Sequence, residues 1–398
     1  MLTALALWAA VAAQDDAARQ ARELVEKLRS DRVEERDEAT RKIKQIGRAA
    51  LPDLEKLVHD KDPEVKQRVQ HLLDYFDIQQ RLPETLSKAF PRLLDRLFSE
   101  GDQAWTDVFV KVQGWTPLYL RDHGLYQDSK PDCWTQRNRD LEFLAARAMR
   151  GVRTQEEFQI LCTDVGVLGL RSAAPEIARA LLSTTDQRKR FFAIDALGTL
   201  KAKECSKDLR ILLSDENPKI RSWVCHALAQ MDATDSVAHL TPLVRDPDLQ
   251  VRGEAAVALA ALGSSEGVST LLALATDNKQ ISLSCLNRLR NPAQWRKLRE
   301  RLCEGEYLAN DNGIDATLAD LTGGKVEMSD AAAENQKRSA RRMELVPLAG
   351  RTVLEAVESF GGQNGNGCIL EPDRIVLKSQ DEILAFWRNW WAEHEKGK

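Results

Sequence analysis

Two stretches of the chain carry nearly the same pattern at a distance of 31 residues, and this repeat constrains the fold more than any other feature. They are Ser214–Asp232 (SDENPKIRSWVCHALAQMD) and Arg245–Gly263 (RDPDLQVRGEAAVALAALG). At this offset Asp215 aligns with Asp246 and Arg221 aligns with Arg252, and Arg190 lies one further offset upstream. A fixed period of this length is typical of architectures in which similar units stack in a row.

The same pattern recurs near the N-terminus. Arg36 lies eleven residues before Gly47, just as Arg252 lies eleven before Gly263. Thirty residues after Arg36, Lys66 occupies the same place. We therefore expect at least five copies of one unit, in two groups.

Each unit has the composition of two short helices joined by a tight turn. In the copy that ends at Gly263, the apolar residues are spaced three and four apart, which is helical spacing: Val251, Ala255, Leu259 and Leu262. The preceding Asp-Pro sequence interrupts the chain and supplies a helix cap, and Gly263 suits the end of a helix. Two short helices cannot bury their own apolar face, so stacking on neighbours is expected.

The pattern resembles that of the HEAT-repeat family. The resemblance is carried by the turn aspartates Asp215 and Asp246, by Pro218 or Pro247, by the arginines that open the second helix, and by the small-residue helices HALAQM and VALAAL. It implies an all-α fold, a right-handed alpha-solenoid of HEAT-like helix pairs. A fold of this kind says little about activity by itself.

We predict five segments. They are a signal peptide at 1–13, N-terminal HEAT-like repeats at 14–80, an irregular aromatic-rich insertion at 81–140, the main HEAT-like array at 141–304, and a polar segment with a C-terminal capping helix at 305–398. In the last segment, DRIVLKS suggests a short strand, and Trp387, Trp390 and Trp391 share one face of the final helix. We expect this face to cover the end of the solenoid, because terminal units need a cap.

Charge and leader composition limit the class of protein. The net charge of −4 argues against general nucleic-acid binding, which usually needs a basic domain. The apolar start MLTALALWAAVAA fits a secretory signal peptide cleaved before Gln14, although it lacks a basic residue, and a plain apolar N-terminus is the alternative. The ending, with LADLTGG and FWRNWW, resembles that of certain exported bacterial HEAT-repeat proteins. We therefore expect a periplasmic or cell-envelope protein whose mature chain does not insert into the membrane.

Cysteine and motif patterns give no sign of a cofactor. The seven cysteines contain no CxxC pair, and we expect most of them to be packed thiols, with one disulfide at Cys133 or Cys368 left open. The GxSxG match at Gly263–Gly267 lies in a turn between helices, where the nucleophile elbow needs a strand before it. LTGGKVE and LANDNGIDATLA lack key residues of a P-loop and of a calcium loop. We predict no metal, no cofactor and no catalytic residue.

The predicted function is a non-catalytic scaffold, acting as a monomer, that binds another protein on the concave face built from the second helices. The predicted contact residues are Arg190, Arg221 and Arg252 on that face and Trp105, Trp115 and Trp134 in the insertion. Two alternatives stay open at these positions. Each arginine pairs with a turn aspartate of its own or the adjacent unit, and the tryptophans fill the seam between repeat groups. The rival function is an enzyme or enzyme subunit, with lyase-like or modifying activity, whose pocket joins residues distant in sequence.

Overall fold

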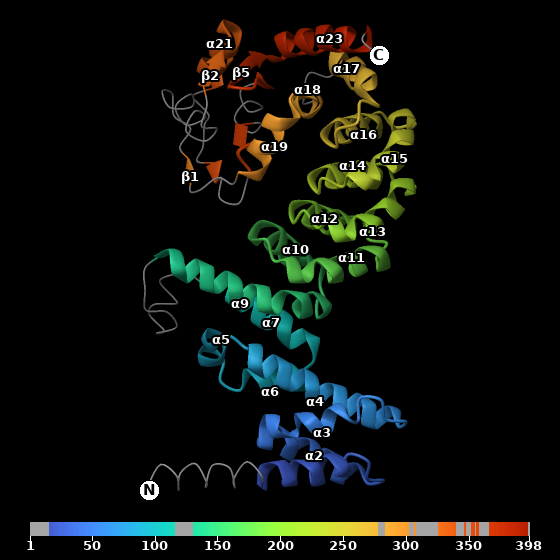
Figure 1. The fold of residues 1–398 in the computed structure, drawn as a ribbon, viewed down its shortest axis with the longest axis vertical. Coiled ribbons are helices and arrows are strands. Elements are labelled where there is room, and N and C mark those ends of the chain that lie inside the picture. The colour runs from blue at the N-terminus through green and yellow to red at the C-terminus, as the bar shows by residue number, and fades with distance from the viewer. Residues whose placement is uncertain are drawn as a thin grey trace. The chain divides into compact units, whose positions relative to one another are not determined.

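The structure is a computed structural model, and its described residues are 16–115, 130–277, 283–301, 306–307, 325–339, 346–347, 352–354, 356–357 and 366–396. The predicted signal peptide at 1–13 lies outside these ranges. The chain divides into two compact units, residues 1–143 and residues 144–398, which are described separately. Figure 1 labels the elements of both.

Unit 1 is built from helices. After a helix over residues 16–27, its elements are α2 (Val33–Ile46), α3 (Leu51–Glu55), α4 (Pro63–Arg81), α5 (Glu84–Ala89), α6 (Leu93–Ser99), α7 (Asp102–Gln113) and the first part of α9 (Lys130–Arg150). Side chains from α2, α3 and α4, including Ile43, Leu54 and Leu72, form one buried core. This core lies in the segment predicted as N-terminal repeats.

The segment 81–140 was expected to be irregular apart from a helical stretch at its start, TLSKAFPRLLDRLF, and most of its described part is helical. Helices α5, α6 and α7 follow one another, and α9 begins at Lys130. Proline and glycine separate these short helices. Pro83 immediately precedes α5, and Gly101 takes a positive φ of 74° immediately before α7, a conformation that glycine adopts without strain.

Unit 2 contains the main array, which confirms the all-α solenoid predicted from the repeat. The inner helices are α10 (Gln155–Leu168), α12 (Gln187–Thr199), α14 (Pro218–Gln230) and α16 (Leu249–Ala261), and each packs on the next. The outer helices are α11 (Ala174–Ser183), α13 (Ser206–Ile211), α15 (Val237–Leu240) and α17 (Val268–Asp277). The right-handedness of the solenoid stays a prediction.

The turns predicted from the Asp and Pro residues begin the inner helices. The side chains of Asp186, Asn217 and Asp248 each accept a hydrogen bond from a backbone N–H in the first turn of the helix that follows. These bonds satisfy donors that a helix N-terminus otherwise leaves open. The predicted terminator Gly263 has a positive φ of 84°. Lys201 and Asp232 take the same left-handed conformation at the ends of α12 and α14.

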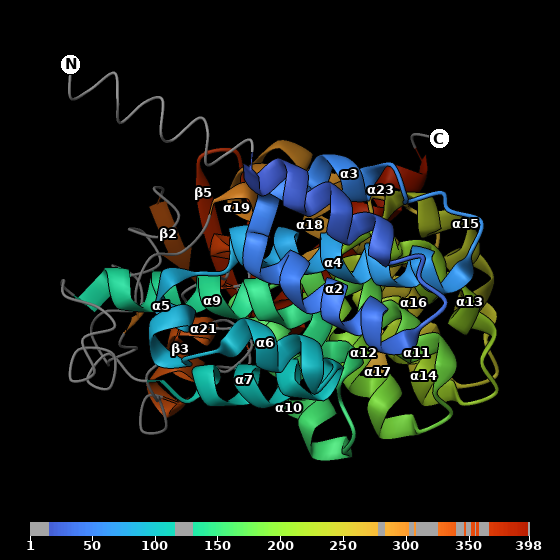
Figure 2. The same ribbon diagram turned by 90° about the horizontal axis from the view of Figure 1, so that it is seen from below.

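The C-terminal part of unit 2 adds helices and a small sheet. The elements are α18 (Asn287–Arg290), α19 (Pro292–Glu300), α21 (Asp330–Ser339), the paired strands β1 (Glu306–Tyr307) and β3 (Val346–Pro347), and the sheet strands β2 (Lys325–Met328), β4 (Asn366–Leu370) and β5 (Arg374–Ser379). In the sheet, β5 lies between β2, which is parallel to it, and β4, which is antiparallel. Only β5 was anticipated, as the strand DRIVLKS. Figures 1 and 2 show the sheet on the opposite side of unit 2 from α13 and α15.

The last helix, α23 (Gln380–Lys396), caps the array as predicted. It packs against α17, β4 and β5. Trp387 is fully buried, and the indole nitrogen of Trp391 donates a hydrogen bond to Ser269 on α17 at 3.2 Å. The helix therefore covers the apolar end of the repeat row.

Candidate functional site

The predicted arginines form a ladder that joins consecutive units. Arg190 donates to the carboxylate of Asp215 at 2.6 Å. Arg221 donates through two nitrogens to the two oxygens of Asp246, at 2.9 and 2.7 Å. In each case the arginine belongs to one unit and the aspartate to the turn of the next, so the pair ties neighbouring units together.

Each arginine also closes the turn of its own unit. Its guanidinium donates to the backbone carbonyl six residues earlier, namely that of Thr184, Asp215 and Asp246 for Arg190, Arg221 and Arg252 respectively. The remaining hydrogen bond of Arg252 goes to the carbonyl of Pro247. A guanidinium presents several donors in a rigid fork, which suits this double role.

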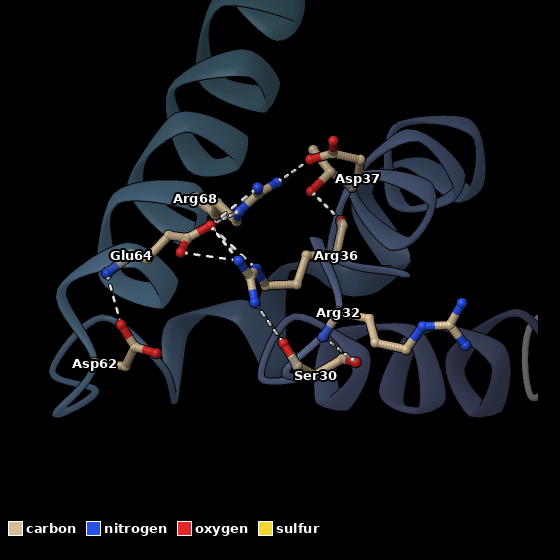
Figure 3. A network of polar contacts seen from close by, with 8 residues as sticks. Ser30, Arg32, Arg36, Asp37, Asp62, Glu64 and Arg68 are labelled. Atoms are coloured by element: carbon tan, nitrogen blue, oxygen red, sulfur yellow. Dashed lines mark hydrogen bonds and ion pairs between the residues drawn. The ribbon is translucent and has the colours of Figure 1, made fainter. Parts of the chain in front are cut away.

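Unit 1 uses the same device with a different acceptor. Arg36 donates to the carbonyl of Ser30, again six residues earlier, and reaches both oxygens of Glu64 at 3.0 Å. Arg68 on α4 crosses back to Asp37 at 2.7 Å and also contacts Glu64 (Figure 3). The sequence aligned Arg36 with the arginines of the main array. Arg36 makes the same two kinds of contact as Arg221, one to a carbonyl of its own turn and one to a carboxylate of the next unit.

For Arg190 and Arg221 these contacts are the pairing with a turn aspartate that the sequence left open, whereas Arg252 binds only the backbone carbonyls of its own turn. The side chains of Arg221 and Asp246 are only 12% and 9% exposed. Burial acts to raise the pKa of Asp246, but the hydrogen bonds from Arg221 and from the N–H of Asp248 outweigh it and lower that pKa. The ladder therefore holds the units together, and its charges are already engaged within the chain.

The tryptophans predicted as contact residues are core residues where the structure describes their side chains. Trp105 is 1% exposed and packs against Phe143, and Trp115 is 5% exposed and stacks on Phe90. These two side chains belong to an apolar core of unit 1, and their burial contradicts the prediction that they contact a partner protein. Trp134 lies on α9, and its side chain lies outside the described residues.

An open surface remains on the inner helices, and we call it the inner-helix face. It consists of residues spaced four, three and four apart, so that they share one side of each helix: Arg188, Phe192 and Asp195 on α12, Lys219, Trp223, His226 and Gln230 on α14, and Gln250, Glu254 and Val257 on α16. All are exposed or partly exposed. Phe191 links two of these helices, with its ring centroid 4.5 Å from that of Trp223. Partly exposed aromatic rings among charged groups are typical of protein-binding surfaces.

Three titratable groups lie on the middle of this face. The imidazole of His226 lies 3.9 Å from the carboxylate of Glu254 and is 58% exposed. Desolvation raises the pKa of Asp195 and of Glu254, and the proximity of His226 partly offsets both shifts. Solvent reaches the imidazole freely, whereas the predicted enzyme alternative required such a group in a deep pocket.

A basic cleft lies at the C-terminal ends of the inner helices. It has a volume of about 270 Å³ and is lined by the ends of α12 and α14 together with α18 and α19. Five cationic side chains line it, and two acidic ones: Lys201, Lys203, Arg288, Arg296 and Arg299, with Asp232 and Glu300. Asp232 pairs with Arg288 and with Lys203, which leaves the lining with an excess of positive charge.

Two buried polar atoms of the cleft lining have no hydrogen-bond partner among the described residues. They are the indole nitrogen of Trp295, a residue only 6% exposed, and the side-chain oxygen of Gln230. The guanidinium of Arg299 lies 5.8 Å from the indole centroid and donates to the backbone carbonyl of Gln230. Sequence reasoning missed this site because Gln230 and Trp295 are far apart in the chain. The available signal was the basic, tryptophan-containing stretch NPAQWRKLRERL.

The thiols are buried and the described side chains offer no metal site. Cys162, Cys205 and Cys225 are buried free thiols, Cys285 and Cys368 are also buried, and Cys133 and Cys303 lie outside the described side chains. No group of three or more His, Cys, Asp or Glu residues in the described ranges is placed to hold a metal ion. Among the helices described, none is both long and apolar enough to cross a bilayer.

One family model matches a part of this chain. It is the model for HEAT repeats, which matches twice, at residues 174–260 and 206–287. A solved crystal structure of an engineered protein is similar at 17% identity, covering 72% of this chain and 95% of its own, with a TM-score of 0.24. No curated protein matches.

Proposed function

Because residues 174–287 are HEAT repeats, which generally serve as surfaces for protein interaction, we propose that this chain is a non-catalytic scaffold that binds a partner protein on the inner-helix face. The observation that carries the proposal is the continuity of this face across α12, α14 and α16. Partly exposed Phe192 and Trp223 lie among charged side chains from all three helices. Aromatic anchors surrounded by a polar rim are the usual anatomy of such interfaces.

The binding residues proposed here differ from the ladder arginines that the sequence predicted. Arg190 and Arg221 already bind turn aspartates, so a partner that engaged them would first have to break those pairs. Arg188 and Lys219 precede them in sequence by two residues, and their side chains are exposed and form no hydrogen bond or ion pair to a described residue. We therefore assign the electrostatic part of partner binding to Arg188 and Lys219.

The test is affinity capture from an extract of the source cells followed by mass spectrometry. The double variant Arg188→Glu with Lys219→Glu reverses two charges on the inner-helix face. The matched control, Lys207→Glu with Arg245→Glu, makes the same charge change at exposed positions outside that face. We expect a protein that the wild type and the control capture equally and that the inner-face variant loses.

Both variants must first show the circular dichroism and melting temperature of the wild type. If both double variants lose the captured protein equally, the attraction is a general electrostatic one, which contradicts a specific binding face. If both double variants retain the captured protein equally, the interface lies elsewhere.

Export is a separate proposal, based on the apolar start of the chain. We propose that the leader is removed before Gln14, and the intact mass of protein recovered from the source cells tests this. A mass that includes residues 1–13 would contradict cleavage there.

A further inference from the structure

We propose that the basic cleft is an anion subsite that takes the carboxylates of an acidic peptide segment from the partner protein. This inference rests on the proposed function, because it assigns the chemistry of one part of that partner. Three features of the cleft support it: its charge, its unsatisfied polar atoms and its position beside the inner-helix face.

The charge of the lining favours an anion. Arg288 and Lys203 are engaged by Asp232, but the side chain of Arg296 is exposed on α19 and forms no hydrogen bond or ion pair to any described residue. Arg299 binds only a neutral backbone carbonyl among the described groups and lies near the face of an indole. Both guanidinium groups therefore retain donors for a carboxylate, which arginine binds in a fork geometry.

The buried indole nitrogen of Trp295 is the second observation. An indole N–H can only donate, and a buried donor without an acceptor is destabilising because the group has lost its hydrogen bonds to water. Such groups are rare in folded proteins and need an explanation. A carboxylate of the bound peptide supplies the acceptor.

Size and position identify the occupant as a peptide segment. The volume of about 270 Å³ lies below the usual range for small-molecule pockets, about 300–1,000 Å³, and suits one or two side chains. Gln230 lines the cleft and also belongs to the part of the inner-helix face that lies on α14. A chain lying on the inner-helix face can therefore continue into the cleft.

The experiment measures binding of a fluorescent hexaglutamate peptide to the full chain by fluorescence anisotropy at about 0.15 M ionic strength, beside hexaglutamine and hexalysine. We expect hexaglutamate alone to bind. Arg296→Glu should weaken it by about tenfold, roughly the loss of one charge-assisted hydrogen bond. The matched control is Lys297→Glu, the same charge reversal at the next residue of α19, which is exposed but does not line the cleft. It should change the affinity by less than about twofold, because screened charges act weakly at a distance.

A second readout follows the indole N–H of Trp295 directly. Its NMR signal, identified by its absence in Trp295→Phe, should shift during the titration while most other indole signals stay in place. No binding of hexaglutamate, equal weakening by Arg296→Glu and Lys297→Glu, or an unmoved Trp295 signal would each overturn the proposal. Inorganic phosphate that binds as tightly as the peptide would also overturn it, by making the cleft a site for free anions.

These outcomes are separable from the proposed function. Partner capture that depends on Arg188 and Lys219, together with a cleft that ignores hexaglutamate, would refute this inference alone. A cleft that binds hexaglutamate beside an inner-helix face that captures nothing would refute the scaffold alone.

Discussion

At the scale of single residues, the carboxylate of Asp246 has two structural roles. One oxygen accepts the N–H of Asp248 at 2.9 Å, which shapes the turn before α16. The two oxygens together accept the guanidinium of Arg221 from the preceding unit. The conformation of a turn and the attachment of its unit to the previous one thus depend on the same side chain.

We predict that Asp246→Asn lowers the free energy of unfolding by about 2 kcal/mol, because a buried arginine loses its charged partner. Urea denaturation monitored by circular dichroism measures the change. Asp235→Asn is the control, since Asp235 pairs with Arg210 at the surface and is 58% exposed. Its effect should stay below about 1 kcal/mol. Equal effects of the two changes would contradict the role assigned to the ladder.

The same pair predicts a dependence of stability on pH. The pKa of Asp246 is lowered in the folded chain, so its contribution to stability is present above the unfolded pKa, about 3.9 for aspartate, and is lost as the pH falls through the folded value. Asp246→Asn should therefore flatten the loss of stability below about pH 4. Melting temperatures across the acid range test this, and an unchanged slope would contradict it.

The buried thiols should be unreactive in the folded chain. Burial raises the pKa of Cys205 to about 11 and that of Cys225 to about 12, so the reactive thiolate is scarce at neutral pH. We expect iodoacetamide to leave both unmodified in the native protein and to modify both in urea, as read by peptide mass spectrometry. Native modification of Cys225 at the rate of a free thiol would show that α14 opens readily.

At the scale of elements, the distance between inner helices depends on small residues. A Cβ added at Gly198 on α12 would lie 3.1 Å from both the Cα and the Cβ of Ala227 on α14. We predict that Gly198→Ala destabilises the fold by about 1–3 kcal/mol, because neither backbone can move without disturbing the next unit. Thermal unfolding measures the effect.

Gly253 on α16 provides the opposite case. A Cβ there meets only a leucine methyl of Leu274, at an ordinary distance of 3.8 Å. Gly253→Ala should therefore stabilise the helix by about 0.5–1 kcal/mol, since alanine is the better helix former. If both alanine variants shift stability in the same direction, the spacing argument fails.

How well the sequence predicted each element depends on how far apart in the chain the contacting residues lie. Helix starts at Asp248 and ends at Gly263 are signalled by neighbouring residues, so the repeat and its turns were readable. The sheet and the basic cleft were not, because they join segments whose contact depends on the packing of the whole unit. The hydrogen bonds of Asn287 to the backbone of Cys368 and Leu370 connect residues about eighty positions apart, and no local pattern announces them.

At the scale of the whole molecule, the array needs a covered end. Helix α23 lies on α17 and buries Trp387 completely. We predict that a chain ending at Ser379 associates into dimers or larger species, because the uncovered apolar surface of the last repeat is then open to water. Size-exclusion chromatography with light scattering should give the monomer mass of 44.7 kDa for the full chain and a multiple of the monomer mass for the shortened one.

The variant Trp391→Ala tests whether capping by α23 depends on the contact of Trp391 or on the buried part of the helix. Trp391 contacts Ser269 at the exposed edge of the helix, so its loss should leave the chain monomeric. A shortened chain that remains monomeric and equally stable would show that α23 is dispensable as a cap.

The arginine ladder also determines how such a chain can change its length. The unit that contains α14 brings one turn aspartate, Asp215, that accepts Arg190, and six residues later it brings Arg221, which reaches the turn that follows. Tandem duplication or loss of this 31-residue segment therefore leaves each of these donors with an acceptor, without a compensating substitution elsewhere. Insertions of other lengths separate donor from acceptor. Descendants of this chain should accordingly differ in their number of units more readily than in the length of any one unit.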